Sequence, residues 1–321
     1  MTRVGVVGLG AVGRVYLDAV SQAPGVTDVV TLVRPSSVER TPASYVLRPL
    51  HERGGAAGRA VSGYRVVALD AVTEPLDLVI VTTPSTALRV DGFVEGIAAL
   101  PGAPIVLGLQ PGLDDRERWL RAVPNERLVI GTLSLASWTA PLDDDDPIRD
   151  GTVCWFPPLS SFAIAGPAAA PVRDVLVAGG MPVRIRPGLE RSIAIPSAAM
   201  VPAIVALELG GWTFRGLRTS GRLARTAQSI RQAIRIAADE LGGRVPFWTS
   251  LVRAPLLWAA SLVAGHVAPF DLERFLHVHF EKVADQTIQQ LETWVEAGGR
   301  HQRDHDAIAA LAAELKEART G

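Results

Sequence analysis

The stretch FLHVHFEKVADQT, residues 275–287, gathers side chains that can bind metals or move protons. It holds two histidines, a glutamate, a lysine, an aspartate and a glutamine among phenylalanines and valines. Three uses are open: a metal site, an acid/base centre, or the water-facing side of a helix. Spacing decides among them, because a helix brings residues three or four apart onto one face.

Hydrophobic periodicity predicts one helix through this stretch. The 100° step turns His277, Glu281 and Asp285 onto one flank, at the four-residue spacing of a water-facing network. The two histidines diverge on such a helix, because residues two apart do not face each other. We therefore predict no metal site here. The buried stripe consists of apolar residues, namely Leu272, Leu276, Phe280, Val283 and Leu291.

A different flank of the same helix carries His279, Lys282 and Gln286, with Phe275 beside them. Reduction of a carbonyl or an imine needs a proton donor within hydrogen-bond reach of the substrate heteroatom. Lys282 is the predicted donor, because desolvation in a cleft between domains lowers the pKa of a lysine. His279 can orient the substrate or share the proton transfer. The alternative is a flank of ordinary surface residues.

The first residues of the chain indicate a source of hydride. Residues 3–7 predict a strand that runs into GLGAVG and a helical pattern. Glycines at these three positions permit a tight turn, close approach of the backbone to a pyrophosphate, and packing of the helix on the strand. The alternative is a glycine-rich turn without a ligand. The predicted cofactor-binding residues of this turn are Gly8, Leu9, Gly10, Ala11, Val12 and Gly13.

The next predicted strand, residues 28–33, ends at Arg34 in the sequence RPSS. NAD-binding proteins usually place a carboxylate here on the ribose 2′-hydroxyl, but none lies between residues 29 and 38. Arg34 can pair with a 2′-phosphate, and Ser36 can donate a hydrogen bond to it. These residues favour NADP(H) over NAD(H). The alternative is that Arg34 is a solvated loop residue.

Further apolar runs alternate with helix-compatible segments, which is the pattern of a parallel α/β sheet. The carboxyl ends of such strands line a cofactor crevice, so we predict that the turns after two of them border the nicotinamide. The same turns can equally do no more than end the strands. The predicted strands are 64–69, 76–83, 104–109 and 127–134, and the turn residues are Thr82, Thr83, Pro84 and Gln110.

Residues 151–167 predict a β-hairpin or two short strands. Before them lie four contiguous aspartates, residues 143–146, which lack the alternating spacing and the glycine of a calcium loop. We interpret them as a solvated turn.

From about residue 189 the strand signals fade and helical periodicity takes over. We therefore predict a Rossmann-type, doubly wound α/β domain over residues 1–188 and an all-helical domain over residues 189–321. The segment 195–209 is apolar on nearly all faces, which predicts a central buried helix with a kink at Pro202. His301 and His305 have the spacing of metal ligands, but their polar surroundings favour helix capping.

Six arginines and no acidic residue occur in residues 215–235. Arg218, Arg222 and Arg225 share one helix face. They could clamp an anionic substrate or the cofactor phosphates. A solvated face or the rim of an oligomer interface is at least as good an interpretation.

Composition narrows the class of protein. With 321 residues and 48% hydrophobic residues the chain can form two domains. Its net charge of −1 gives no positive field for nucleic acid. Cys154 is the only cysteine, which excludes an internal disulfide and fits a reducing compartment. The start lacks the pattern of a signal peptide, and the uncharged runs 192–207 and 254–270 fall short of a membrane span. We expect a cytoplasmic protein.

The sequence resembles the ketopantoate reductase family over nearly its whole length. The resemblance rests on the GLGAVG start, the strand that ends in Arg34, the segment from Asp150 to Val153 that leads to AGP, and the helical second half. It implies an NADPH-dependent reductase with its active site between the domains. The helical domain would be of the kind found at the C-terminus of 6-phosphogluconate dehydrogenases.

The family's catalytic residues do not carry over. Where the family has two lysines, two asparagines and a glutamate, this chain has Pro84, Pro111, Ile193, Ser197 and Asp271. We list Ser197 and Asp271 with the candidate catalytic residues for that reason. The resemblance therefore implies reduction of a small 2-oxo acid or imine other than ketopantoate. The alternative is a regulatory dinucleotide-binding protein that has lost the chemistry.

The expected partners are a small-molecule substrate and a second copy of the chain, without nucleic acid or membrane. Trp212, Trp248, Trp258 and Trp294 indicate apolar surface in the helical domain that can form a dimer interface. The alternative is that these tryptophans are buried in the hydrophobic core, which is commoner for aromatic residues at helical spacing.

Overall fold

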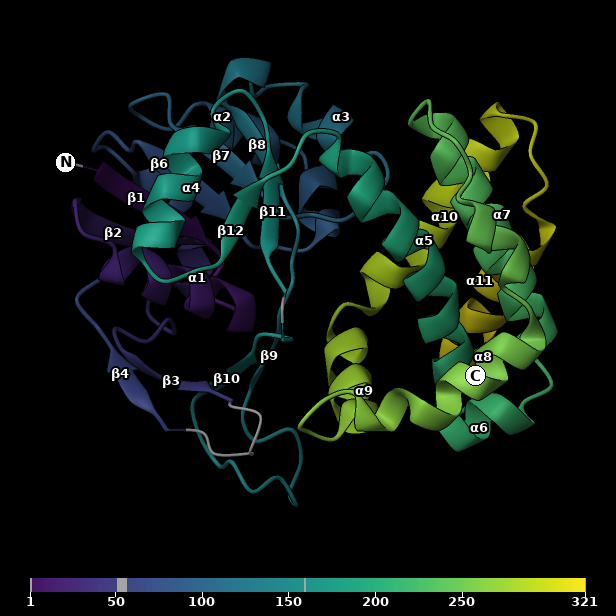
Figure 1. Cartoon of the computed structure of the whole chain (residues 1–321). Coiled ribbons are helices and arrows are strands. Elements are labelled where there is room, and N and C mark those ends of the chain that lie inside the picture. The colour runs from purple at the N-terminus through teal and green to yellow at the C-terminus, as the bar shows by residue number, and fades with distance from the viewer. Residues whose placement is uncertain (1, 51–56, 159, 321) are drawn as a thin grey trace. The chain divides into compact units, whose positions relative to one another are not determined.

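The computed structural model describes residues 2–50, 57–158 and 160–320, which fall into two compact units (Figure 1). Unit 1 comprises Met1–Gln110 and Asp115–Leu189, and unit 2 comprises Pro111–Asp114 and Glu190–Gly321. The division after Leu189 lies one residue beyond the boundary predicted from the sequence. The assignment of Pro111–Asp114 to unit 2 is an addition that no sequence signal indicates.

Unit 1 is built on an eight-stranded sheet. Neighbouring strands in this sheet run parallel, except that β8 and β11 are antiparallel. The strand order reverses between β1 and β6. A reversal of this kind is the place where doubly wound sheets bind ligands, at the carboxyl ends of the strands. The predicted Rossmann-type fold is confirmed. In spatial order the strands are β12 (Val183–Ile185), β11 (Phe162–Ala165), β8 (Leu128–Gly131), β7 (Ile105–Gly108), β6 (Leu78–Val81), β1 (Thr2–Val7), β2 (Val26–Val33) and β5 (Arg65–Ala68).

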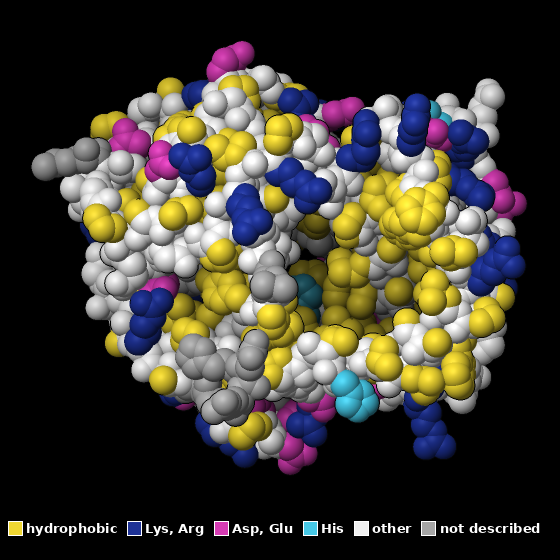
Figure 2. Space-filling model, in the orientation of Figure 1, with side chains coloured by type: hydrophobic (Ala, Val, Ile, Leu, Met, Phe, Trp, Pro, Cys, Tyr) yellow, Lys and Arg dark blue, Asp and Glu magenta, His cyan; other side chains and the backbone are white. Residues whose placement is uncertain are grey.

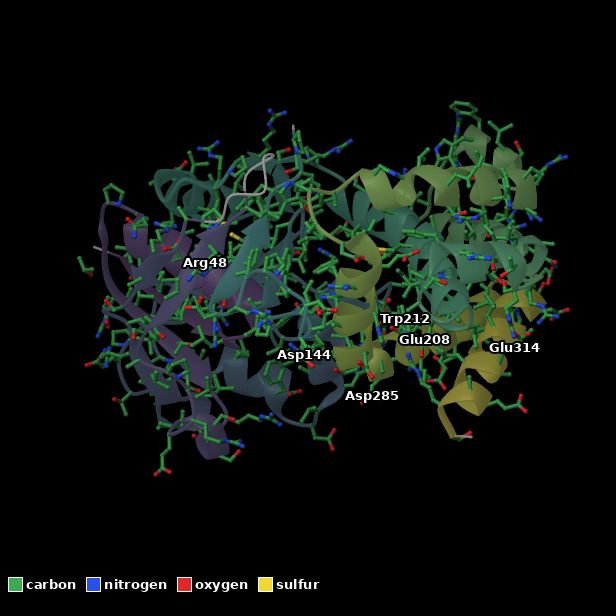
Figure 3. All side chains as sticks on the ribbon, turned by 90° about the horizontal axis from the view of Figure 1, so that it is seen from below. Arg48, Asp144, Glu208, Trp212, Asp285 and Glu314 are labelled. Atoms are coloured by element: carbon green, nitrogen blue, oxygen red, sulfur yellow. The ribbon has the colours of Figure 1, made fainter. Side chains whose placement is uncertain are left out.

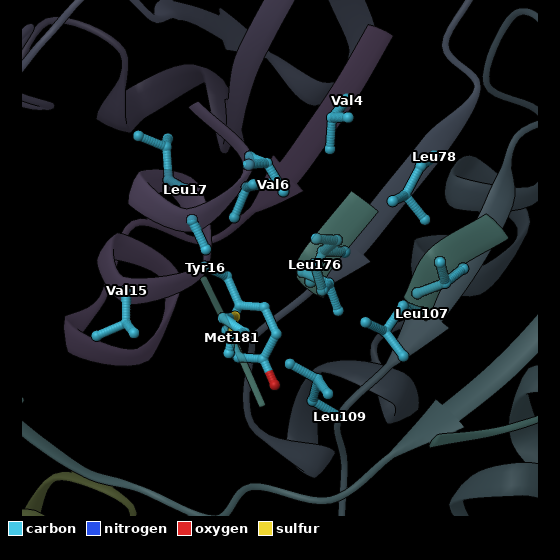
Figure 4. Packing of buried hydrophobic residues seen from close by; sticks show 14 of the residues in the cluster. Val4, Val6, Val15, Tyr16, Leu17, Leu78, Leu107, Leu109, Leu176 and Met181 are labelled. Carbon is cyan, nitrogen blue, oxygen red and sulfur yellow. The ribbon is translucent and has the colours of Figure 1, made fainter. Parts of the chain in front are cut away.

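Helices bury both faces of this sheet, which explains why its strands are almost purely apolar. Side chains alternate along each strand, so that Val4 and Val6 pack toward α1 (Ala11–Gln22) and α4 (Ala169–Ala178) (Figure 4). Val7 packs on the other side, in a cluster with residues of α2 (Phe93–Ala98) and α3 (Asp115–Trp119).

A second, four-stranded sheet belongs to unit 1, and no sequence pattern predicts it. Its order is β4 (Arg59–Val61), β3 (Tyr45–Pro49), β10 (Thr152–Trp155) and β9 (Ala136–Thr139). The predicted hairpin over 151–167 is wrong, because β10 pairs in this sheet whereas β11 pairs in the large one. The alternative of two short strands is correct. Pairing between distant segments is set by tertiary contacts, which local propensity does not contain.

The small sheet is attached to one side of α1. The guanidinium of Arg14 donates a hydrogen bond to the Thr152 hydroxyl over 2.9 Å and lies over the ring of Tyr45. Asp18, which is buried, pairs with Arg59. Cys154 lies in the same packed region, where burial raises the pKa of its thiol to about 12. This thiol is therefore inert as a nucleophile at neutral pH.

Unit 2 is helical in its described residues, which confirms the predicted all-helical second half. Alanine and branched aliphatic residues of α5, α7, α10 and α11 form its core. The predicted buried helix is α5, and at 20 residues it is long and apolar enough to span a membrane by length and composition, but it packs in this core. The helices are α5 (Leu189–Glu208), α6 (Phe214–Thr219), α7 (Leu223–Glu240), α8 (Ala254–Val263), α9 (Leu272–Lys282), α10 (Ala284–Arg300) and α11 (Asp306–Thr320).

The single helix predicted through residues 275–287 is wrong. The helix is interrupted at Val283, whose φ of −113° and ψ of 28° are not helical. Val283 ends α9 and precedes α10. Near the break, the guanidinium of Arg319 donates to the Ala284 carbonyl over 2.9 Å. It also pairs with Glu208 of α5, which is labelled in Figure 3. No glycine or proline marks the break, so the residue pattern predicts continuity where tertiary contacts favour a bend.

Candidate functional site

The glycine-rich turn lies at the strand-order reversal of unit 1, between the end of β1 and the start of α1. Gly8 has a φ of 89°, a conformation that favours glycine. A Cβ atom added to Gly13 would lie 1.9 Å from the Gly8 carbonyl oxygen, so the helix packs directly on the turn. A Cβ atom added to Gly10 would meet nothing within 4 Å. The turn thus has one open position, at the N-terminus of α1.

The N-terminus of α1 is suited to an anion. Gly10 precedes it without a side-chain cap, and its first turn carries no acidic residue. Unpaired backbone N–H groups and the helix dipole favour a negative charge at such an end. Leu9, Ala11 and Val12 are partly buried around it. These residues fit the pyrophosphate of a dinucleotide.

Thr82 and Thr83 follow β6, the strand on the other side of the reversal. The Thr82 hydroxyl lies 3.0 Å from the Val7 carbonyl oxygen and 2.9 Å from that of Gly8, and so ties the two strand ends together. The Thr83 hydroxyl is buried without a hydrogen-bond partner among the described residues. A buried hydroxyl of this kind is a candidate ligand contact, since unpaired polar atoms are costly.

Gln110 lies at the end of the next strand, and its side chain is engaged by the protein itself. Its amide donates to the carbonyl oxygens of Val81 (3.1 Å) and Thr83 (2.8 Å) and accepts from the Trp119 indole (3.2 Å). Gln110 therefore holds the turn after β6 in place. Its predicted contact with the cofactor stays a prediction.

Pro84 is exposed and starts a short 3₁₀ helix, Ser85–Arg89. The buried Ser85 hydroxyl donates to the buried Asp115 carboxylate over 2.6 Å, and Arg89 lies 3.2 Å from the same carboxylate. This network holds the residues that follow the turn, whereas Gln110 holds Thr83 within it.

Arg34 lies just beyond β2, at the predicted position for the adenosine ribose. Its side chain is exposed and forms no hydrogen bond or ion pair within residues 2–50, 57–158 and 160–320. Ser36 is exposed in the 3₁₀ helix Pro35–Ser37 that follows. A cation without a partner beside an exposed hydroxyl can receive a phosphate.

His279 of α9 is packed between aromatic rings. It stacks on Phe275 with ring centroids 5.4 Å apart and meets the edge of Phe280 at 5.0 Å. Burial first, and then the positive charge of Lys282, lower the pKa of His279 below its usual value of 6.5. The imidazole is therefore neutral at neutral pH, and can accept a proton or a hydrogen bond rather than donate from a charged form.

The break at Val283 separates the three residues of the predicted flank. His279 and Lys282 stay three residues apart on α9, whereas Gln286 lies in the first turn of α10. The Lys282 side chain is exposed, so unit 2 alone supplies no desolvation for it. Its catalytic role stays a prediction.

The remaining candidate residues, Asp271 and Ser197, lie at the start of α9 and on α5. Asp271 caps α9, where its carboxylate accepts from the Arg274 amide over 3.0 Å. Ser197 is buried within α5. The predicted water-facing network is confirmed in part, since His277 and Glu281 lie 3.8 Å apart and are exposed. Asp285 lies beyond the break, on α10.

The other predicted polar features form turns and ion pairs. Within the aspartate run, the Asp146 carboxylate accepts from the amides of Leu142 and Ile148. His301 pairs with Glu240 at 2.6 Å, and the His305 ring lies 2.7 Å from the Arg303 carbonyl. The described residues contain no cluster that could hold a metal ion.

Apolar side chains are exposed on unit 2, where Figure 2 shows yellow surface. Trp258 is 48% exposed and Trp248 is 38% exposed, whereas Trp294 is buried in the core. Trp212 stacks on His277. The predicted homodimer stays a prediction, for which the exposed tryptophans are a candidate interface. The large apolar residues exposed between 245 and 267 are Val245, Phe247, Trp248, Leu251, Leu256, Trp258, Leu262, Val263 and Val267.

The two glycines of the turn give a test that separates packing from binding. Gly13→Ala would force a Cβ atom against the Gly8 carbonyl, so we expect a loss of about 1–3 kcal/mol in the free energy of unfolding. Gly10→Ala adds its Cβ atom in open space and should leave stability unchanged, while weakening dinucleotide binding at least about tenfold. Chemical denaturation and calorimetric titration measure the two effects. Equal stability of both variants would contradict the packing.

The lowered pKa of His279 predicts a pH dependence of stability. Below about pH 6.5 the unfolded chain binds a proton at this residue, whereas the folded protein does so only below the lowered pKa. Stability should therefore fall as the pH decreases through that window. In His279→Gln the fall should be smaller, as measured by urea denaturation at several pH values. His266→Gln, at an exposed histidine, is the control and should follow the wild type.

Comparison with known proteins rests on structure, because no protein-family model and no curated protein matches the chain. A D-mandelate dehydrogenase with NADH and anilino(oxo)acetate has a TM-score of 0.72 at 14% identity, over 99% of this chain and 97% of that one. A PanE/ApbA family ketopantoate reductase from Ralstonia eutropha JMP134 has a TM-score of 0.72 at 18% identity, over 98% and 97%.

A dimeric ketopantoate reductase from Staphylococcus aureus has a TM-score of 0.67 at 13% identity, over 98% of both chains. These identities are low, so the likeness concerns the fold. The chain has the fold of these ketopantoate reductases and of this D-mandelate dehydrogenase, in agreement with the resemblance noted in the sequence.

Proposed function

We propose that this protein is an oxidoreductase that uses NADPH to reduce a small-molecule carbonyl or imine. The observation that carries the proposal is the glycine-rich turn at the strand-order reversal, where Gly10 leaves open space at an uncapped helix N-terminus. The fold, which is shared with reductases and a dehydrogenase, supports it. When bound, the dinucleotide supplies hydride, which no protein side chain can do.

Residues of unit 1 would hold the cofactor. The backbone amides around Gly10 and the dipole of α1 would bind the pyrophosphate. Arg34 and Ser36 would bind the 2′-phosphate, for which Arg34 is exposed and uncommitted among the described residues. Thr83 offers a hydroxyl beside Gly8 that lacks a described partner.

Arg34→Ala tests the choice of NADPH. Loss of a charged hydrogen-bond partner of the 2′-phosphate should weaken NADPH binding by about 10- to 100-fold, which corresponds to about 1.5–3 kcal/mol. Binding of NADH should stay as in the wild type. Isothermal titration calorimetry with each cofactor gives both values. Arg121→Ala, at an exposed arginine elsewhere on unit 1, is the matched control. Unchanged NADPH affinity in Arg34→Ala would remove the argument for NADP(H).

A proton must reach the substrate heteroatom as hydride adds to its carbon. We assign this step to the Lys282 ammonium, which has three donor hydrogens, with His279 as a neutral group that orients the substrate. Gln286 can donate a further hydrogen bond to the substrate. This assignment requires a substrate to approach the exposed end of α9.

Lys282→Ala tests the proton donor. General acids contribute about 100- to 10,000-fold to the rate, so kcat for a genuine substrate should fall by that factor while NADPH affinity is kept. The chain contains one other lysine, Lys316, which pairs with Glu292 on the surface. Lys316→Ala is therefore the matched control and should keep full activity. Steady-state kinetics with a substrate found by screening oxo acids and imines measures the effect. Full turnover in Lys282→Ala would assign the proton to another group.

A second candidate function is a dinucleotide-binding regulatory protein without catalysis. It is favoured by the exposure of Lys282 and by Ile193 and Ser197 at positions where the resembled family has catalytic residues. NADPH binding without NADPH oxidation across the substrate screen would favour this function. Turnover of any oxo acid or imine would exclude it.

A further inference from the structure

Five of the six arginines of residues 215–235 separate into two groups once their partners are known. Arg218 donates to the Ser261 carbonyl over 2.9 Å, and so links α6 to α8. Arg222 and Arg225 both pair with Glu314 of α11, which is labelled in Figure 3. These three arginines hold helices of unit 2 together. Their guanidinium groups are therefore already engaged within unit 2, and the predicted clamp for an anion stays a prediction for them.

Two of the others, Arg231 and Arg235 of α7, line a surface pocket of about 420 Å³. Arg253, which precedes α8, lines the same pocket, together with Ser250 and Ala254. A hydrogen bond of 2.5 Å from the Arg231 guanidinium to the Val252 carbonyl fixes Arg231 beside Arg253. The volume lies within the range of small-molecule sites.

The pocket is positively charged without compensation. None of its lining residues is acidic, and Arg231, Arg235 and Arg253 form no ion pair in the part of the chain that the structure describes. Ala254 starts α8, so the positive end of that helix dipole adds to the field.

A neighbouring pocket shows the contrast. It has a volume of about 640 Å³ and is lined by Arg222 and Arg225, but Glu314 and Glu317 line it as well. Carboxylates there neutralise the arginines. The pocket at Arg231, Arg235 and Arg253, hereafter the arginine pocket, lacks such groups among its lining residues.

We propose that the arginine pocket binds the oxyanion of a small molecule, a phosphate or a carboxylate. Guanidinium groups recognise both through paired hydrogen bonds. Ser250 also lines the pocket, where its hydroxyl donates to the Phe247 carbonyl over 3.0 Å and its own carbonyl oxygen accepts from the Arg253 Nε over 3.4 Å. Phe247, Leu251 and Leu256 are exposed near it in sequence, at 88%, 61% and 49%. An anion that carries an apolar chain therefore fits the chemistry better than a bare ion. This site does not depend on the reductase function proposed above.

The test is a binding titration of the full-length protein in the Gly10→Ala/Arg34→Ala background, which weakens both candidate phosphate sites of unit 1. Inorganic phosphate, acetate and hexanoate are titrated at constant ionic strength set with NaCl, by calorimetry. We expect saturable binding, with hexanoate tighter than acetate. In Arg235→Gln/Arg253→Gln, binding of every probe should weaken at least about tenfold. Arg215→Gln, at an exposed arginine outside the pocket, is the control and should bind as the parent does.

Each result decides the proposal. Phosphate tighter than hexanoate would assign the headgroup as a phosphate, and the reverse would assign a carboxylate with an apolar chain. Absence of saturable binding, or equal weakening in Arg215→Gln, would overturn the proposal. The single variant Arg235→Gln, at an exposed residue, repeats the test if the double variant is misfolded by circular dichroism. Since binding is the readout, failure of the reductase proposal leaves this result unaffected.

Discussion

The contact between Gly13 and the carbonyl oxygen of Gly8 is the constraint on which the site of unit 1 depends. It brings the first turn of α1 onto the end of β1, and the Thr82 hydroxyl then joins the end of β6 to the same turn. The packing of the turn and the Thr82 hydrogen bonds therefore hold the open end of α1 at the strand-order reversal. The side of the same helix carries Arg14 and Asp18, which attach the small sheet. One helix thus positions both the uncapped end at the glycine-rich turn and the second sheet.

Features that depend on local pattern could be predicted from the sequence. The glycine spacing after a β-branched run identified the turn, and the strands buried on both faces read as continuous apolar runs. Features that depend on distant contacts could not. The small sheet pairs β3 with β10, about a hundred residues further along the chain, and β10 is too short to reveal which sheet it joins. The break at Val283 likewise lacks glycine or proline, and Arg319 near the C-terminus is part of what surrounds it.

In the candidate site, the sequence likewise predicts which residues are present and near one another, but not what surrounds each of them in the fold. Gln110 was placed at the correct strand end, but its amide is engaged by two backbone carbonyls and an indole. Periodicity placed His279 and Lys282 near each other, three residues apart, and it could not reveal that one is packed between rings while the other is exposed. The neutral state of His279 follows from that packing. Burial lowers the pKa of His279 most, and the positive charge of Lys282 lowers it further.

The arginines make this limit most explicit, because all six occur in one sequence run and carry the same charge. What distinguishes them is the position of Glu314, which lies about ninety residues further along the chain. Glu314 forms ion pairs with Arg222 and Arg225, but not with Arg231 or Arg235. Arg253 lies outside the run, and only the fold brings it to the same pocket. An ion pair between an arginine and a carboxylate links two helices, whereas the positive charge of an arginine without a carboxylate partner can attract an anionic ligand. The location of carboxylates, rather than of arginines, therefore determines where unit 2 can bind an anion.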